Sequence, residues 1–202
     1  MTVPSLMQNY QRQSYVTQLH KVYNEMTQAF MQHMTEKNAL NLTEAGLNTP
    51  ASMKPFFHEH FKVIQDCEKG VTSPCFVDNY KNLNGSLHTG INKNGWTKGA
   101  CVVIASGASI CSDNVVAGNV FIDINGPKPP NIIGRDAFYM YLHNDGILDV
   151  ASATPACRTN GECGGSTLEK IREKGTSCEA SSSLTDYNCF GKILNDNWEM
   201  NY

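Results

Sequence analysis

Eight cysteines carry the clearest chemistry in this 202-residue chain. Structural zinc sites usually contain cysteines about two to four residues apart, whereas the closest pair here is Cys157 and Cys163. The even number and the wide spacing favour disulfides formed in an oxidising compartment over metal binding or free thiols. The eight candidates are Cys67, Cys75, Cys101, Cys111, Cys157, Cys163, Cys178 and Cys189.

The pairing of these cysteines is open, because eight cysteines allow on the order of 100 arrangements. Cys67 and Cys75 flank the turn-rich segment EKGVTSP, so we predict this disulfide. A hairpin with a two- or three-residue loop would place Cys111 opposite Val102 or Val103, not opposite Cys101. We therefore expect a Cys101–Cys111 bridge to be possible only diagonally.

The segment His58-Glu59-His60 invites comparison with metal sites. Residues two apart on a helix point in different directions, and the HExxH pattern of zinc proteases is absent. We interpret both histidines as surface or packed residues, and we expect no metal ligand and no cofactor.

A second cluster of oxygen-bearing side chains surrounds a proline-rich loop. Asp123 can accept backbone N–H bonds and so fold the turn at Asn125-Gly126. Asp136 can cap the loop from its other side, or pair with Arg135 or Lys128. Together Asp123, Asn125 and Asp136 could instead bind calcium, since hard cations favour several oxygens, although the spacing is not that of an EF-hand. We favour the loop-structure interpretation.

Other functional classes find little support. The sequence contains no G-x-S-x-G elbow and no Walker loop, and an even cysteine count disfavours a cysteine nucleophile, so we do not expect an enzyme. The net charge is −3, and the densest basic cluster, residues 170–174, is interleaved with glutamates, so we expect no nucleic-acid partner. Sequons at Asn41 and Asn84 are interpreted as chance matches in an asparagine-rich chain.

The longest element that must position these residues is a helix predicted from Pro4 to about Leu40. Its apolar residues recur mostly every three or four positions, and neither glycine nor proline occurs between Leu6 and Ala45. A helix of about 37 residues would be roughly 55 Å long, more than a small domain's diameter. We expect this rod to project, or to be held at one end by something outside the chain.

The rest of the chain predicts an antiparallel sheet followed by an irregular tail. We expect a helix over 53–66 capped by Ser52, a short strand at 75–77, and a short helix over 167–174 capped by Ser166 and stopped by Gly175. A last helix, over 185–195, is weakened by Gly191, and Trp198 and Tyr202 should pack back onto the body. Further strands are expected at 100–105, 108–111, 115–124, 136–142 and 147–150, and an irregular, cross-linked loop at 151–165.

These elements predict an α+β fold in which a long N-terminal helix packs on a small antiparallel β-sheet, with a disulfide-rich C-terminal region. We expect a single domain over residues 1–202. Its parts are the N-terminal helix (1–45), a helix and loop region (46–99), the antiparallel sheet (100–150) and the disulfide-rich C-terminal region (151–202).

This layout resembles that of type IV pilins and type II secretion pseudopilins. The segment Val3–Tyr10 resembles the junction between a prepilin's membrane-embedded half-helix and its soluble half. The segment VFIDING…PN…GRDAF, residues 120–138, resembles the V-D-x-N-G…P-N…G-x-D-x-F signature of many bacterial pilin-like proteins. The ending, Cys189 to Tyr202, is also similar to endings in that group.

The resemblance implies a pilin-like structural subunit of a type IV pilus or a type II secretion-like filament. Its partners would be copies of itself or other pilins, and the inner membrane through a removed N-terminal helix. It would lie at the cell surface in an extracellular filament, or in the periplasm anchored in the inner membrane. The family's cleavage site and apolar segment are missing here, so we expect an N-terminal membrane helix to have been removed upstream of this sequence. The alternative is a minor pilin or adhesin that binds a ligand through loops 81–99 and 151–165.

Overall fold

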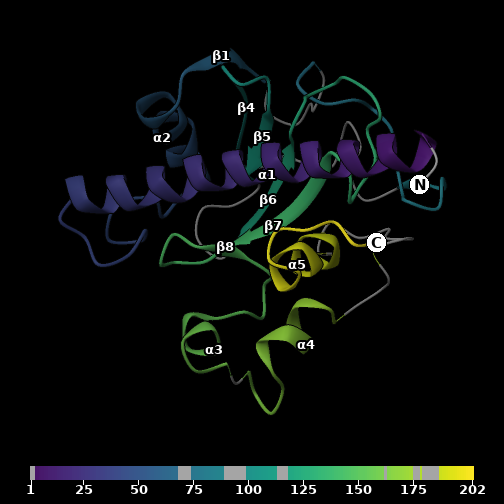
Figure 1. Cartoon of the computed structure of the whole chain (residues 1–202). Helices are drawn as coiled ribbons and strands as arrows, with labels where there is room; N and C mark the ends of the chain where they lie inside the picture. The colour runs from purple at the N-terminus through teal and green to yellow at the C-terminus, as the bar shows by residue number, and fades with distance from the viewer. Residues whose placement is uncertain are drawn as a thin grey trace.

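A single long helix crosses a six-stranded antiparallel sheet (Figure 1). The computed structural model describes residues 3–67, 74–88, 99–112, 118–161, 163–174, 178 and 187–202. Within this part of the chain the architecture is α+β, with an N-terminal helix, an antiparallel sheet and four disulfides. The predicted fold class is confirmed at this level.

Helix α1 (Val3–Glu36) contains 34 residues and confirms the predicted rod. Its buried side chains follow the helical repeat, so one stripe faces the body of the protein. The helix ends about one turn earlier than expected, at Asn38, whose φ of 49° lies in the left-handed region. The amide of Asn38 donates to the carbonyl of Thr35, and the amide of Ala39 donates to that of Met34. This is the Schellman pattern, which satisfies the last carbonyls of a helix. The buried stripe consists of Val16, Leu19, Val22, Met26, Ala29, Phe30 and His33.

The sheet has the strand order β1-β4-β5-β6-β7-β8, and all neighbours are antiparallel. From β4 to β8 the chain forms a simple meander, while β1 comes from earlier in the sequence and forms an edge. The strands are β1 (Val63–Asp66), β4 (Ala100–Ile104), β5 (Ser109–Ser112), β6 (Gly118–Asp123), β7 (Ala137–Leu142) and β8 (Leu148–Asp149).

The middle strands are buried along almost their whole length. Helix α1 lies across the sheet (Figure 1), and the segment 74–88 also packs on it. Phe121 and Tyr139 are opposite each other in β6 and β7, with ring centroids 4.7 Å apart. Phe76 and Tyr80 contact Phe121 at 5.4 and 5.3 Å. The core is therefore a sheet covered by a helix and by an aromatic loop. That loop contains β2 (Tyr80–Lys81) and β3 (Leu87–His88), a small hairpin whose turn includes Gly85, at a φ of 85°.

Two of the expected elements after α1 are wrong. Helix α2 (Met53–His60) follows a short 3-10 turn and ends six residues before the predicted boundary. Its continuation becomes β1, because Phe61 adopts an extended conformation and the chain then pairs with β4 at the sheet edge. The Ser52 hydroxyl donates to the Thr49 carbonyl, 2.7 Å away, and does not cap α2. The predicted strand at 75–77 is irregular chain.

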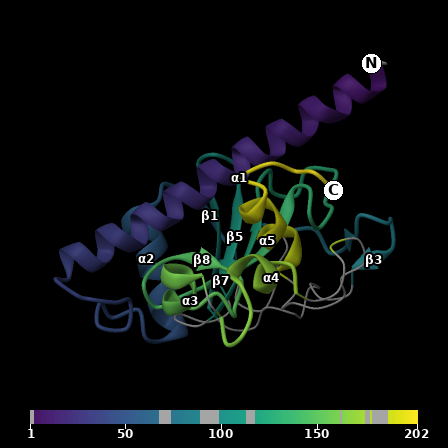
Figure 2. The same cartoon turned by 60° about the horizontal axis from the view of Figure 1, so that its bottom comes forward.

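The tail contains three short helices, α3 (Pro155–Asn160), α4 (Leu168–Arg172) and α5 (Asn188–Asn195). They lie together beside β7 and β8 (Figure 2). The predicted irregular loop 151–165 thus contains a helix, capped by the Thr154 hydroxyl, which accepts from the amide of Cys157. The cap of α4 is Thr167 and not Ser166. The expected stop at Gly175 and the expected start of α5 at 185 lie outside the described residues, as does the start of the strand predicted at 115.

Gly191 does not interrupt α5, although it was expected to weaken it. A β-carbon at this position would lie 2.1 Å from the carbonyl oxygen of Arg172 in α4. The glycine therefore allows the two helices to approach each other closely. The C-terminal residues pack back onto the body, as predicted. Trp198 stacks on His20 of α1, with ring centroids 4.0 Å apart, and the Tyr202 hydroxyl donates to the carbonyl of Gly134.

Candidate functional site

The four disulfides join all eight predicted cysteines. Cys67–Cys75 is the pair expected from the sequence. Three of the four bridges involve cysteines outside the sheet, so they hold irregular segments in place. The remaining bridges are Cys101–Cys111, Cys157–Cys163 and Cys178–Cys189.

The expectation that Cys101 and Cys111 could meet only diagonally is wrong. The two residues are directly opposite each other in β4 and β5, with Cα atoms 4.1 Å apart. The loop begins one residue earlier than assumed, because the amide of Ile104 donates to the carbonyl of Ala108. Gly107, at a φ of 90°, closes this three-residue loop. A glycine in the left-handed region is typical of such hairpins.

The acidic residues around the proline-rich loop take the structural roles expected of them. The Asp123 carboxyl group accepts from the amide of Asn125 at 3.2 Å and from the Tyr80 hydroxyl at 2.6 Å. The Asp136 carboxylate accepts from the amides of Asn131 and Ile132 at 2.8 and 2.7 Å. Each carboxylate therefore holds one end of the loop 124–136.

Both carboxyl groups are fully buried, and their protonation follows from this. Burial raises the pKa of Asp123 to about 8, with a further contribution from the nearby Asp136 charge, while the Tyr80 bond acts in the opposite direction. Burial also raises the pKa of Asp136, against the effect of the amides that it accepts from. Burial and the Asp123 charge raise the pKa of Tyr80 far above its usual range.

The first turns of α1 extend beyond the body of the protein (Figure 2). Met7 and Tyr10 expose 60% and 75% of their surface, and the first buried residue of the described stripe is Val16. A groove runs between this part of α1 and the end of the chain, where Arg12 and Val16 face Trp198 and Met200. Among the helices in the described part of the chain, none has both the length and the apolar character that a membrane crossing requires.

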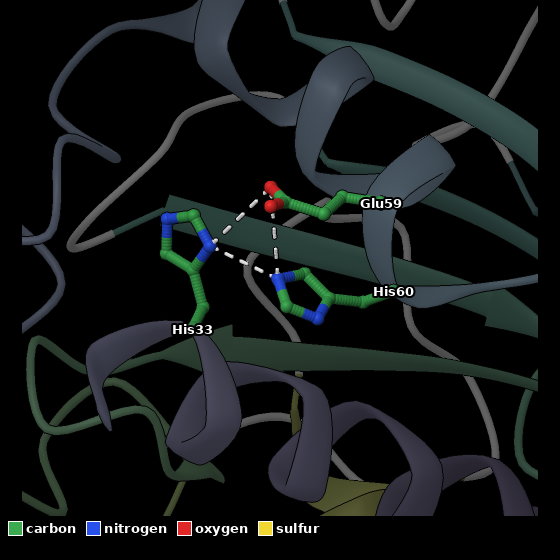
Figure 3. Close-up of side chains that lie close together, drawn as sticks. All are labelled: His33, Glu59 and His60. Carbon is green, nitrogen blue, oxygen red and sulfur yellow. Dashed lines mark hydrogen bonds and ion pairs between the residues drawn. The ribbon is translucent and has the colours of Figure 1, made fainter. Parts of the chain in front are cut away.

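A cluster of two histidines and a glutamate joins α1 to α2 (Figure 3). His33 lies in the last turns of α1, whereas Glu59 and His60 end α2. Phe56 of α2 stacks on Phe30 of α1 at 4.8 Å, and its ring also contacts His33 and His60. Because Phe30 and His33 are one turn apart, this aromatic stack brings the two imidazole rings together.

The three side chains form a compact triangle. His33 Nδ1 lies 3.0 Å from His60 Nε2, and Glu59 Oε2 lies 3.8 and 3.9 Å from these two nitrogens. The histidine side chains are 6% and 2% exposed, whereas that of Glu59 is 48% exposed. His33 Nε2 lies 3.2 Å from the carbonyl oxygen of Ala45. Burial lowers the pKa of His33, and the neighbouring His60 lowers it further.

The sequence interpretation of residues 58–60 is correct in one respect and incomplete in another. His58 and His60 do point apart, since His58 Nε2 lies 2.9 Å from Asp66 of β1. The segment itself gives no sign of His33, which lies 27 residues before its partner His60. His33 could have been recognised as an unusual residue from its place in the buried stripe of α1, three residues after Phe30, where an apolar side chain is expected.

Comparison with protein-family models, with curated protein sequences and with solved structures finds no match to this chain.

Proposed function

We propose that this chain is a structural subunit of a helical surface filament of the type IV pilin or type II secretion pseudopilin kind. The observation that carries the proposal is the N-terminal part of α1, which extends beyond the body with Met7 and Tyr10 exposed (Figure 2). The side chains of residues 7–11 are all exposed, and positions 12–15 are exposed or half-buried before Val16 becomes buried.

The projecting turns continue the packed part of α1 and carry apolar side chains that a partner could cover. Tyr10 and Met7 offer apolar surface among polar neighbours, which suits an interface between subunits better than a solvent-facing spacer. The groove between α1 and the C-terminal residues 198–201 adds an adjoining concave surface.

The disulfides support an extracellular assembly. Each one typically stabilises a fold by about 2–4 kcal/mol, chiefly by restricting the unfolded chain. Two of the four lie in the C-terminal region after residue 151. This distribution fits a subunit whose tail faces outward while α1 faces the filament axis, at the cell surface or in the periplasm. Copies of the same chain or related subunits would be the partners.

Site-specific photocrosslinking in the producing cells tests the proposal. A photoreactive phenylalanine analogue is placed at Tyr10, with Thr159 as the matched control because it is exposed on α3 in the tail. We expect a ladder of covalent multimers from position 10 and mainly monomer from position 159. Monomer from both positions, or equal ladders from both, would refute a role for α1 as the packing surface.

A further inference from the structure

We propose that His33, Glu59 and His60 bind a divalent transition-metal ion, with zinc as the best match. The ion would join the end of α1 to the end of α2, and a water molecule would complete its coordination. This site is independent of the filament proposal, because all three ligands belong to one chain (Figure 3).

The distances within the triangle fit a single ion. A triangle with sides of 3.0, 3.8 and 3.9 Å has a circumcentre about 2.1 Å from each corner. Zinc–nitrogen bonds are about 2.0–2.1 Å long and zinc–carboxylate bonds about 2.0–2.2 Å. An ion near this centre would therefore contact all three atoms without any large movement of the helices.

The hydrogen bond to the Ala45 carbonyl selects the His33 tautomer that can bind a metal through Nδ1. A carbonyl oxygen can only accept, so Nε2 of His33 carries the proton and Nδ1 keeps its lone pair directed at the cluster. Metal-bound histidines commonly donate their second ring N–H to a carbonyl or carboxylate in this way.

A direct hydrogen bond between the two rings accounts for only part of the arrangement. It explains the 3.0 Å contact between the nitrogens, but Glu59 Oε2 is beyond hydrogen-bond reach of both rings. Ligands that share one zinc ion lie about 3.3–3.6 Å apart, as follows from the bond lengths for tetrahedral and trigonal geometry. The observed separations of 3.0, 3.8 and 3.9 Å lie on either side of this range, so small side-chain shifts would let one ion contact all three groups.

The ligand set also indicates which ions would bind. Two imidazoles and one carboxylate suit zinc, copper or nickel, whereas magnesium and calcium favour sites made of oxygens alone. The two histidines are buried and Glu59 is half exposed, so the open coordination position faces solvent on the Glu59 side. The ion would thus be reachable from solution and would fasten α2 onto α1.

Zinc titration of the purified full chain, after dialysis against EDTA, tests the proposal. We expect one equivalent of zinc to bind and the Tm to rise, with EDTA reversing both. Glu59→Gln should weaken binding at least tenfold, because it removes a charged ligand. His58→Gln is the control on the same helix: it removes the other histidine–carboxylate pair, with Asp66, and should leave the affinity within about twofold.

A second ligand variant and a competition with magnesium complete the test. His33→Gln should abolish the Tm rise, and circular dichroism will show whether this buried variant still folds. Excess magnesium should not compete. The absence of stoichiometric zinc binding, full affinity in Glu59→Gln, or an equal loss in His58→Gln would each overturn the proposal.

Discussion

Replacing Asp123 by asparagine should make the stability of this protein less dependent on pH above neutrality. Burial raises the pKa of the Asp123 carboxyl from 3.8 to about 8 in the folded protein. In the unfolded chain the group titrates near its usual value. Between these two pKa values the folded state holds a proton that the unfolded state has released.

The direction of the effect follows from this difference in bound protons. Stability from the protonated carboxyl is fully present below about pH 4 and is lost as the pH rises toward and through about 8. Between about pH 7 and pH 9 the loss amounts to about 1.4 kcal/mol for this one group. For a chain of this length, that corresponds to a fall in Tm of about 3–6 °C.

The chosen pH range separates Asp123 from the buried histidines. Burial lowers the pKa of His33 and of His143, so these rings are largely neutral in both states above pH 7. Asparagine is close in shape to aspartic acid but does not titrate, and the Tyr80 hydroxyl can still bond with it. The difference in pH dependence between wild type and Asp123→Asn therefore reports residue 123 together with its electrostatic coupling to the buried Asp136.

Urea unfolding followed by circular dichroism at both pH values, with EDTA present, provides the measurement. We expect wild type to lose about 1.4 kcal/mol more than Asp123→Asn between the two pH values. Equal losses in the two proteins would show that Asp123 is already ionised at pH 7. The account of this carboxyl as a buried, protonated partner of Tyr80 would then be refuted.

Substitutions at three further sites test the packing by urea unfolding. Gly191→Ala should destabilise by about 1–3 kcal/mol, because its β-carbon would meet the Arg172 carbonyl; a gain of about 1 kcal/mol from helix propensity alone would contradict this. Arg172→Ala should lower the free energy of unfolding by about 3–5 kcal/mol, since it leaves the buried Asp149 carboxylate without its bidentate partner. A smaller loss there than in Asp149→Asn would contradict that reasoning. Asn38→Ala should destabilise by about 1 kcal/mol, whereas Asn38→Gly should not, because only glycine accepts the left-handed φ freely; equal losses would rule this out.

Elements with a strong local period were predicted well. The repeat of threes and fours in the first forty residues predicts α1, and alternating or continuous apolar runs predict β4 to β8, each to within a few residues at the ends the structure describes. These signals are local, because a residue's neighbours within one or two turns decide which face it occupies. The same holds for the bonds that Asp123 and Asp136 accept from backbone amides, which span five residues or fewer along the chain.

Predictions failed where a distant partner decides the outcome. The segment after His60 can continue a helix, but it becomes β1 because the edge of β4 is available to it. Gly191 resembles a helix breaker in isolation, and only the position of α4 shows why it is small. The cysteine register failed for a smaller reason, a hairpin loop that begins one residue earlier than assumed.

The sequence by itself determined the α+β class, the long first helix and the use of cysteines as disulfides, because composition and short-range period carry that information. Only the tertiary structure brought His33 of α1 to Glu59 and His60 of α2, and Tyr80 to Asp123. Such long-range contacts depend on how whole elements pack. For the histidine cluster, the Phe30–Phe56 stack determines which turns of α1 and α2 face each other. No spacing along the chain encodes that contact.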